Sequence, residues 1–182
     1  MTRPVLYVVV CGAPLASRAL DGIREASGRG WSPILIPTQA ARPWLDPLEL
    51  ANVKVVDGQR LPNEPKAAPA PDAVVVAPTT FNTLTGWANG RANTYPLSTL
   101  CAALGGGVPT VAVPFAKHDL AGHPAWLASL AVLRYAGVTL VDPSTGALNA
   151  IEPVASGTGD QVAADFKWSW VLDQLGEAEG HV

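Results

Sequence analysis

Four side chains that can hold or transfer protons lie close together in the segment Phe115–Trp126. Lys117, His118 and Asp119 are consecutive, and His123 follows shortly after them. Histidine changes its charge near neutral pH, so this grouping is typical of general acid–base catalysis. A structural interpretation also stays open, in which His118 is a solvated loop residue and His123 caps the next helix. Zinc binding would need a fixed geometry that a loop-like segment does not favour, so we expect no metal.

A second polar grouping lies in Ala73–Asn93, where an apolar run of strand type ends at a turn and a helix-compatible stretch follows. The carboxyl ends of parallel strands and the N-terminal amides of helices meet at the edge where open α/β folds bind ligands. The turn therefore predicts a binding site, although it is also compatible with a plain helix cap. The candidate residues are Pro78, Thr79, Thr80, Phe81, Asn82 and Asn93.

The N-terminal part of the chain offers two further candidate regions for a nucleotide-like ligand. The β-branched run Val5–Cys11 is typical of a strand buried on both faces, and a glycine turn into a helix follows it. Helix-end amides attract phosphate, which makes Gly12, Ala13, Pro14 and Ser17 candidates. Thr38 follows a second short strand and is either a helix cap or a ligand contact.

The elements that must position these residues alternate between strand and helix along the chain. Strands are expected at 5–11, 33–37, 53–56, 72–77, 109–113 and 138–141, with helices at 15–26, 39–50, 96–104, 125–135 and 162–175. Prolines should shorten the helix at 39–50, and loops should occupy 57–71 and 143–159. In a continuous last helix, Trp168 and Trp170 could not both face inward. The alternation predicts a Rossmann-like three-layer α/β/α fold with a doubly wound parallel sheet.

Length and composition limit the class of protein. The 182 residues suit a single domain over 1–182, with 176–182 as a frayed tail. A net charge of −3 without a basic run argues against a nucleic-acid partner. No apolar stretch reaches the roughly 18 residues of a membrane span. Two cysteines, Cys11 and Cys101, make no disulfide framework, so we expect core packing for both and a cytoplasmic location.

Taken together, these segments resemble the homo-oligomeric flavin-containing cysteine decarboxylase superfamily. The motif Pro78-Thr-Thr-Phe-Asn-Thr is similar to its flavin-binding Pro-Ala-Ser-Ala-Asn-Thr, and Gly90-Arg-Ala-Asn93 to its Gly-x-Ala-Asp. The spacing from Pro114 to His123-Pro124 also equals that of the decarboxylases' substrate loop. The resemblance covers about residues 5–143. It implies non-covalently bound FMN and a homo-oligomer, a trimer or a multiple of trimers.

Two features of the relatives' catalytic apparatus are absent from the sequence. Relatives carry a histidine shortly before the motif strand, whereas residues 61–72 contain none. Lys117 stands in the place of the substrate-clamping asparagine, and an ammonium group only donates hydrogen bonds. The Arg-Glu pair of the flavin prenyltransferases is missing as well. Neither chemistry is therefore carried over unchanged.

Besides an FMN-dependent reductase, for whose nicotinamide donor the sequence marks no site, the resemblance and the departures leave two functions open. One is flavin-dependent, decarboxylase-like redox chemistry on a small molecule or a peptide terminus, in which the flavin accepts the electrons and the protein handles protons. The other is a non-catalytic flavin-binding, carrier or regulatory protein that has lost the decarboxylase residues. Whether the chain is an enzyme stays undecided at this point.

Overall fold

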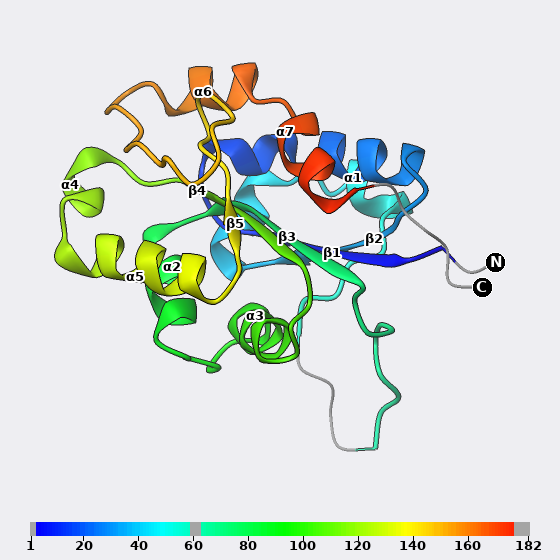
Figure 1. The fold of residues 1–182 in the computed structure, drawn as a ribbon. Coiled ribbons are helices and arrows are strands. Elements are labelled where there is room, and N and C mark those ends of the chain that lie inside the picture. Colours follow the sequence, from blue (N-terminus) through cyan, green and yellow to red (C-terminus); the bar gives the residue numbers. More distant parts are fainter. Residues whose placement is uncertain (1–2, 59–62, 177–182) are drawn as a thin grey trace.

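The fold is built on one parallel sheet whose strand order reverses at its centre. The structure is a computed structural model that describes residues 3–58 and 63–176. Its strands pair in the order β2-β1-β3-β4-β5, and every pairing is parallel (Figure 1). The reversal lies between β1 and β3, which is where open α/β sheets form a ligand crevice. The strands are β1 (Val5–Val10), β2 (Ser32–Pro37), β3 (Ala73–Thr79), β4 (Thr110–Pro114) and β5 (Thr139–Leu140).

Helices cover both faces of this sheet (Figure 1). One layer holds α1, α6 and α7, and the other holds α2, α3 and α5. The predicted three-layer Rossmann-like fold is therefore confirmed. The helices are η1 (Pro14–Arg18), α1 (Ala19–Gly28), η2 (Gln39–Trp44), η3 (Glu49–Asn52), α2 (Phe81–Ala88), α3 (Tyr95–Gly105), α4 (His118–Ala121), α5 (Pro124–Tyr135), α6 (Gly159–Asp165), α7 (Ser169–Leu172) and η4 (Asp173–Leu175).

Alternate residues of the central strands supply two separate cores. Val8 and Val75 are buried in the cluster beneath α1, whereas their neighbours Val9 and Val76 are buried in the cluster beneath α2 and α5. Successive side chains of a strand point to opposite faces, so a strand covered on both sides must be apolar throughout. This requirement explains the unbroken valine runs. The polar turns follow these runs, so they lie at the edge of the sheet where the strands end.

The predicted strand at 53–56 is wrong. Only Val55 forms a bridge, to Leu35 of β2, through hydrogen bonds from Leu35 N to Lys54 O and from Val56 N to Leu35 O. The chain then leaves the sheet, so the pairing ends after these two bonds. Within the described residues the sheet has five strands rather than the expected six.

The single helix predicted at 162–175 is also wrong. Helix α6 ends at Asp165 because Phe166 adopts an extended backbone, with φ −61° and ψ 135°. The break lets both tryptophans reach Phe166, with ring centroids 5.5 Å away for Trp168 and 5.6 Å away for Trp170. Trp168 is buried, and Trp170 is partly buried against the same cluster. Only on a continuous helix would two side chains that are two residues apart be unable to face inward together.

The other elements differ from expectation mainly at their ends. The helix expected at 15–26 begins as the 3-10 turn η1 before α1, and the prolines restrict 39–50 to the short 3-10 helices η2 and η3, as predicted. Apart from Gly176, the expected tail at 176–182 lies outside the described residues. None of the helices in the described ranges has the length and hydropathy needed to cross a bilayer.

Candidate functional site

A cavity of about 830 Å³ lies at the carboxyl edge of the sheet, near the ends of β2 and β3. Its size is within the range of cavities that hold small-molecule ligands and cofactors. The walls come from the segments after β2 and β3, from the residues after Val56 and from the start of α3. The lining residues are Pro37, Thr38, Gln39, Ala40, Arg42, Asp57, Gly58, Thr80, Asn82, Thr83, Asn93, Thr94, Tyr95, Pro96 and Leu97.

Thr38 has a buried hydroxyl at this cavity without a hydrogen-bond partner in the described part of the chain. Its backbone is held in place, because Thr38 N donates to Val10 O at 2.8 Å and Thr38 O accepts from Ala41 N at 3.0 Å. The hydroxyl does not cap η2. A buried polar group without a partner costs free energy, so this oxygen is suited to a ligand that hydrogen-bonds to it.

Two helix N-termini also line this 830 Å³ cavity, which is called the larger cavity below. In α2, Leu84 N donates to Thr80 O at 2.8 Å and closes the first turn, while the Thr80 side chain makes no capping bond. The first amides of a helix lack partners within the helix and carry partial positive charge. In α3, Thr94 Oγ1 accepts from Leu97 N at 3.4 Å and satisfies one of these amides. The edge therefore offers hydrogen-bond donors to an anionic or carbonyl-rich ligand.

The larger cavity holds one pair of opposite charges. Arg42 Nη2 donates to Asp57 Oδ2, and both side chains are about half exposed. The pair joins η2 to the start of the proline-rich segment and leaves the cavity with little net charge. An anion placed here would compete with Asp57 for the guanidinium group.

A second cavity of about 450 Å³ adjoins the first, and Ala40, Thr80 and Asn82 line both. This smaller cavity lies over the ends of β1 and β4. It is more apolar than its neighbour, because aromatic and aliphatic side chains form most of its walls. The lining residues are Gly12, Ala13, Pro14, Ala40, Trp44, Thr80, Phe81, Asn82, Phe115, Ala116, Lys117, Leu120, Val154, Ala155 and Gly159.

Gly12 is required by packing within the protein. A Cβ atom at Gly12 would lie 2.3 Å from Ala40 O, so the chain after β2 occupies the space that a side chain would need. Ser17 Oγ donates to Pro14 O at 2.8 Å, and Ser17 lines neither cavity. The close approach at Gly12 thus brings the β1 and β2 turns together and shapes the boundary of both cavities.

The predicted flavin-binding residues divide between the two cavities. Thr38 and Asn93 line the larger one, and Gly12, Ala13, Pro14 and Phe81 line the smaller one, with Thr80 and Asn82 shared. Pro78 and Thr79 belong to β3 and line neither cavity. Thr79 is buried, and its hydroxyl donates to Val76 O at 2.8 Å.

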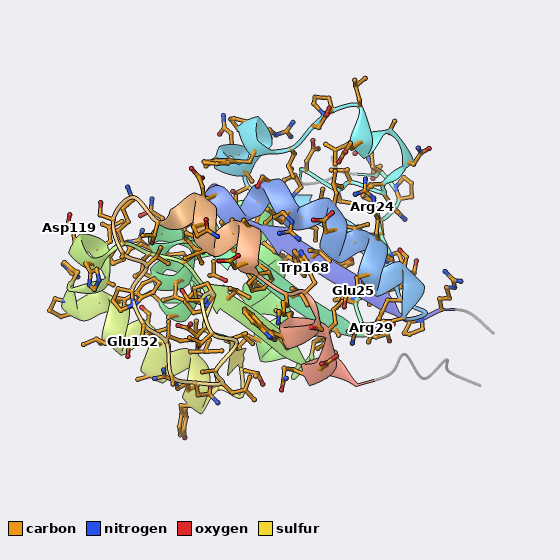
Figure 2. The ribbon with its side chains drawn as sticks, turned by 90° about the horizontal axis from the view of Figure 1, so that it is seen from above. Arg24, Glu25, Arg29, Asp119, Glu152 and Trp168 are labelled. Carbon is orange, nitrogen blue, oxygen red and sulfur yellow. The ribbon has the colours of Figure 1, made fainter. Side chains whose placement is uncertain are left out.

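Of the four side chains in Phe115–Trp126 that can transfer protons, one lines a cavity. Lys117 lines the smaller cavity, whereas His118, Asp119 and His123 are exposed and line neither. Figure 2 shows Asp119 at the outer edge of α4. His123 Nδ1 accepts from Ala125 N at 3.1 Å and caps α5, as the structural interpretation expected. Its ring lies edge-on to Phe81, with centroids 5.9 Å apart.

Replacing His123 with alanine should lower the free energy of unfolding by about 1 kcal/mol, because the α5 cap is lost. Asparagine accepts the same type of bond, so His123→Asn should retain most of the stability. Urea unfolding followed by circular dichroism measures both variants. Equal losses in the two variants would contradict the capping role.

Cys11, at the end of β1, contacts Thr83 of α2. Its Sγ lies 3.2 Å from Thr83 Oγ1 at hydrogen-bonding distance, and the residue is buried. Burial raises the pKa of the Cys11 thiol, with smaller opposing effects from Thr83 and Thr80. A thiol with a raised pKa is a poor nucleophile, so packing is its main role. Cys101 is partly buried, and its Sγ contacts Arg91 O at 3.3 Å.

Sequence reasoning missed the residues that complete both cavities. Arg42 and Trp44 follow Thr38 on η2, so the expected position of Thr38 at the sheet edge could have indicated them. Asp57 and the segment 154–159 carry no such signal, because only the folded chain brings them to this edge.

Solved structures similar to this chain share its fold. TvaF, an FMN-dependent cysteine decarboxylase from thioviridamide biosynthesis, is 21% identical over 90% of this chain and 100% of that chain, with a TM-score of 0.66. A dodecameric FMN-dependent Ubix-like decarboxylase from Escherichia coli O157:H7 is 21% identical over 98% and 97%, with a TM-score of 0.69. The FMN binding protein AtHal3 is 18% identical over 99% and 100%, with a TM-score of 0.69.

Family membership follows from the sequence match. No curated protein matches the chain at a significant level. The model of the Flavoprotein family, in contrast, matches residues 6–165, which is most of the chain. Apart from Val5 of β1, the matched range includes the five strands, and it includes all the residues given above as lining the two cavities. The chain belongs to the Flavoprotein family.

Proposed function

We propose that this protein binds FMN non-covalently in the larger cavity, with the phosphate beside Thr38 and Arg42. The observation that carries the proposal is the buried Thr38 hydroxyl, which has no partner in the described part of the chain. Phosphate oxygens accept hydrogen bonds strongly and would satisfy both this hydroxyl and the guanidinium group. FMN-binding neighbours of the same fold support the choice of flavin.

The flavin ring would lie toward Thr80 and Asn82, where the two cavities meet. Thr80 and Asn82 belong to the segment that resembles the family's flavin-binding motif. The phosphate position differs from the turn at Gly12–Ser17, because Ala40 fills the open side of Gly12 and Ser17 lines neither cavity. A flavin placed in this way has its ring next to the smaller cavity, which leaves room there for a second molecule.

The proposed activity is flavin-dependent, decarboxylase-like redox chemistry on a small molecule or a peptide terminus. A bound flavin supplies the capacity to accept two electrons. The chain would position the flavin with Thr38 and Arg42, and Lys117 would supply a positive charge at the smaller cavity. We further propose a cytoplasmic location and a homo-oligomer, with a trimer or a multiple of trimers as the expected state, and the dodecameric neighbour supports the oligomer.

A second candidate is a flavin-binding protein without catalysis. The observation that favours it is the position of His118, Asp119 and His123, which are exposed and line neither cavity. General acid–base groups must come within hydrogen-bonding reach of the reacting atoms. Reduction of the bound flavin by a substrate under anaerobic conditions would distinguish the enzyme from the carrier.

FMN titration followed by fluorescence quenching tests the proposed site. Arg42→Gln should weaken FMN binding by up to about fivefold, because it removes a half-exposed cation worth about 1 kcal/mol. Asp57→Asn should strengthen FMN binding by a similar factor, because the carboxylate no longer competes for Arg42. Both effects should be much smaller for riboflavin, which lacks the phosphate.

Two results would contradict this placement. Absence of FMN binding to the unaltered protein would remove the proposed function altogether. Equal responses of FMN and riboflavin to Arg42→Gln would place the phosphate elsewhere. The exposed Arg134 provides a matched control, since it lines neither cavity and Arg134→Gln should leave both affinities unchanged.

A further inference from the structure

A third cavity, of about 430 Å³ and called the side cavity below, adjoins the larger cavity beside α3. Gly58 and Tyr95 line both cavities, so the two spaces meet at these residues. The remaining walls come from Tyr7 of β1, from Ser98 of α3 and from the proline-rich segment that precedes β3. A ligand in the larger cavity therefore has a second space next to it, separate from the smaller cavity over β1 and β4.

The proline-rich segment that forms one wall of the side cavity is held to the sheet by Tyr7. Figure 1 shows residues 63–71 on the side of the sheet that α3 covers. Tyr7 is buried, and its hydroxyl donates to Pro69 O at 2.5 Å. Burial raises the pKa of Tyr7, with a smaller effect from Tyr95, so the phenol keeps its proton at neutral pH. This hydrogen bond makes the side cavity part of the fold.

The side cavity combines an aromatic surface with a single positive charge. Tyr95 is partly buried at the start of α3, and Ser98 adds a hydroxyl. Among the described residues that line this cavity, Lys66 is the only charged one, and it forms no ion pair with them or with the rest of the described chain. Nucleotide bases stack on aromatic side chains, and lysine binds phosphate.

The passage between the side cavity and the larger cavity is open at Gly58. Apart from its chain neighbours, a Cβ atom at Gly58 would meet no atom of the described protein within 4 Å. Gly58 follows Asp57, whose carboxylate accepts a hydrogen bond from Arg42. Arg42 stands at the position proposed above for the flavin phosphate. The side cavity therefore begins next to the phosphate end of that flavin.

We propose that the side cavity binds the nucleoside monophosphate unit of an adenine nucleotide, with its base on Tyr95 and its phosphate at Lys66. The inference rests on the proposed function, because FMN in the larger cavity would place its own phosphate next to this unit. Two sources carry such a unit. One is the adenylate half of FAD, which continues from the flavin phosphate, and the other is a free adenine nucleotide bound beside FMN.

Calorimetric titration with FMN, FAD and AMP distinguishes the two sources. If the unit belongs to FAD, FAD should bind about tenfold more tightly than FMN, because the base gains a stacking contact. If the nucleotide is free, AMP should bind to FMN-saturated protein, and FAD should gain nothing over FMN.

Substitutions in the side cavity test the two contacts with either source. Lys66→Gln should weaken the binding of the adenylate unit by up to about fivefold, because an exposed cation is removed. Tyr95→Leu should weaken it about tenfold, because the stacking surface is lost. The matched controls are Lys54→Gln and Tyr135→Leu, since both residues are exposed and line none of these three cavities. Neither control should change the binding of the adenylate unit.

Two results would overturn the assignment of the side cavity. One is that AMP does not bind to FMN-saturated protein and FAD binds no more tightly than FMN. The other is that Lys66→Gln or Tyr95→Leu leaves the binding of the adenylate unit unchanged. Binding of AMP that depends on Lys66, in a protein that does not bind FMN, would refute the proposed function alone.

Discussion

Replacement of Trp168 with alanine is expected to lower the free energy of unfolding by about 3–5 kcal/mol. The Trp168 ring fills the space above Gly22 of α1, where an added Cβ atom would lie 2.5 Å from the ring. Its Nε1 donates to Arg18 O at 2.9 Å. Figure 2 shows Trp168 beside α1, in the region of Glu25 and Arg29. Truncation would leave a cavity and a carbonyl without its partner.

The substitution should also disturb the candidate site. Trp168 anchors the segment that begins at Gly159, and Gly159 lines the smaller cavity. Equilibrium urea unfolding measures the stability. The control is Tyr135→Ala, which truncates an aromatic side chain that is 96% exposed and should change the stability by less than about 0.5 kcal/mol. A loss for Trp168→Ala no larger than that of the control would show that this contact does not anchor the segment.

Replacement of Thr38 with valine is expected to weaken FMN binding by about 10-fold to 100-fold, with little effect on stability. The substitution removes one hydroxyl and keeps the shape of the side chain. A hydrogen bond to a charged group contributes about 1.5–3 kcal/mol, which corresponds to this range. Because the hydroxyl has no partner in the described protein, its removal should not cost folding free energy.

Fluorescence titration with FMN and urea unfolding of the same variant separate these two effects. Thr139→Val is the matched control, since Thr139 lies in β5 and lines neither cavity. It should leave FMN affinity unchanged. If Thr38→Val bound FMN as tightly as the unaltered protein, the unpaired hydroxyl would not be a flavin contact. A weakened fold in this variant would show instead that the hydroxyl serves the protein itself.

The sequence by itself determined the layers of the fold and the sheet edge at which the candidate site lies. Apolar runs such as Val74–Val76 suit only strands covered on both faces, and parallel strands place the turns that follow them along one edge. Local chemistry also offered the α5 cap at His123 as one of two interpretations and predicted the break of the helix at 39–50. These features depend on neighbours in the chain, so the order of residues is sufficient to predict them.

Tertiary structure decided which of the candidate residues share a cavity. His118, Asp119 and His123 are close in sequence, yet α4 and the α5 cap leave them exposed, because the fold around this loop is set by contacts with Val154 and Thr79. Arg42 meets Asp57 at the larger cavity only because the chain returns past β2. Likewise, Trp168 packs on Gly22 of α1 after the chain leaves α6 at the extended Phe166. Such long-range packing overrides local propensity, and the spacing of residues along the chain does not predict it.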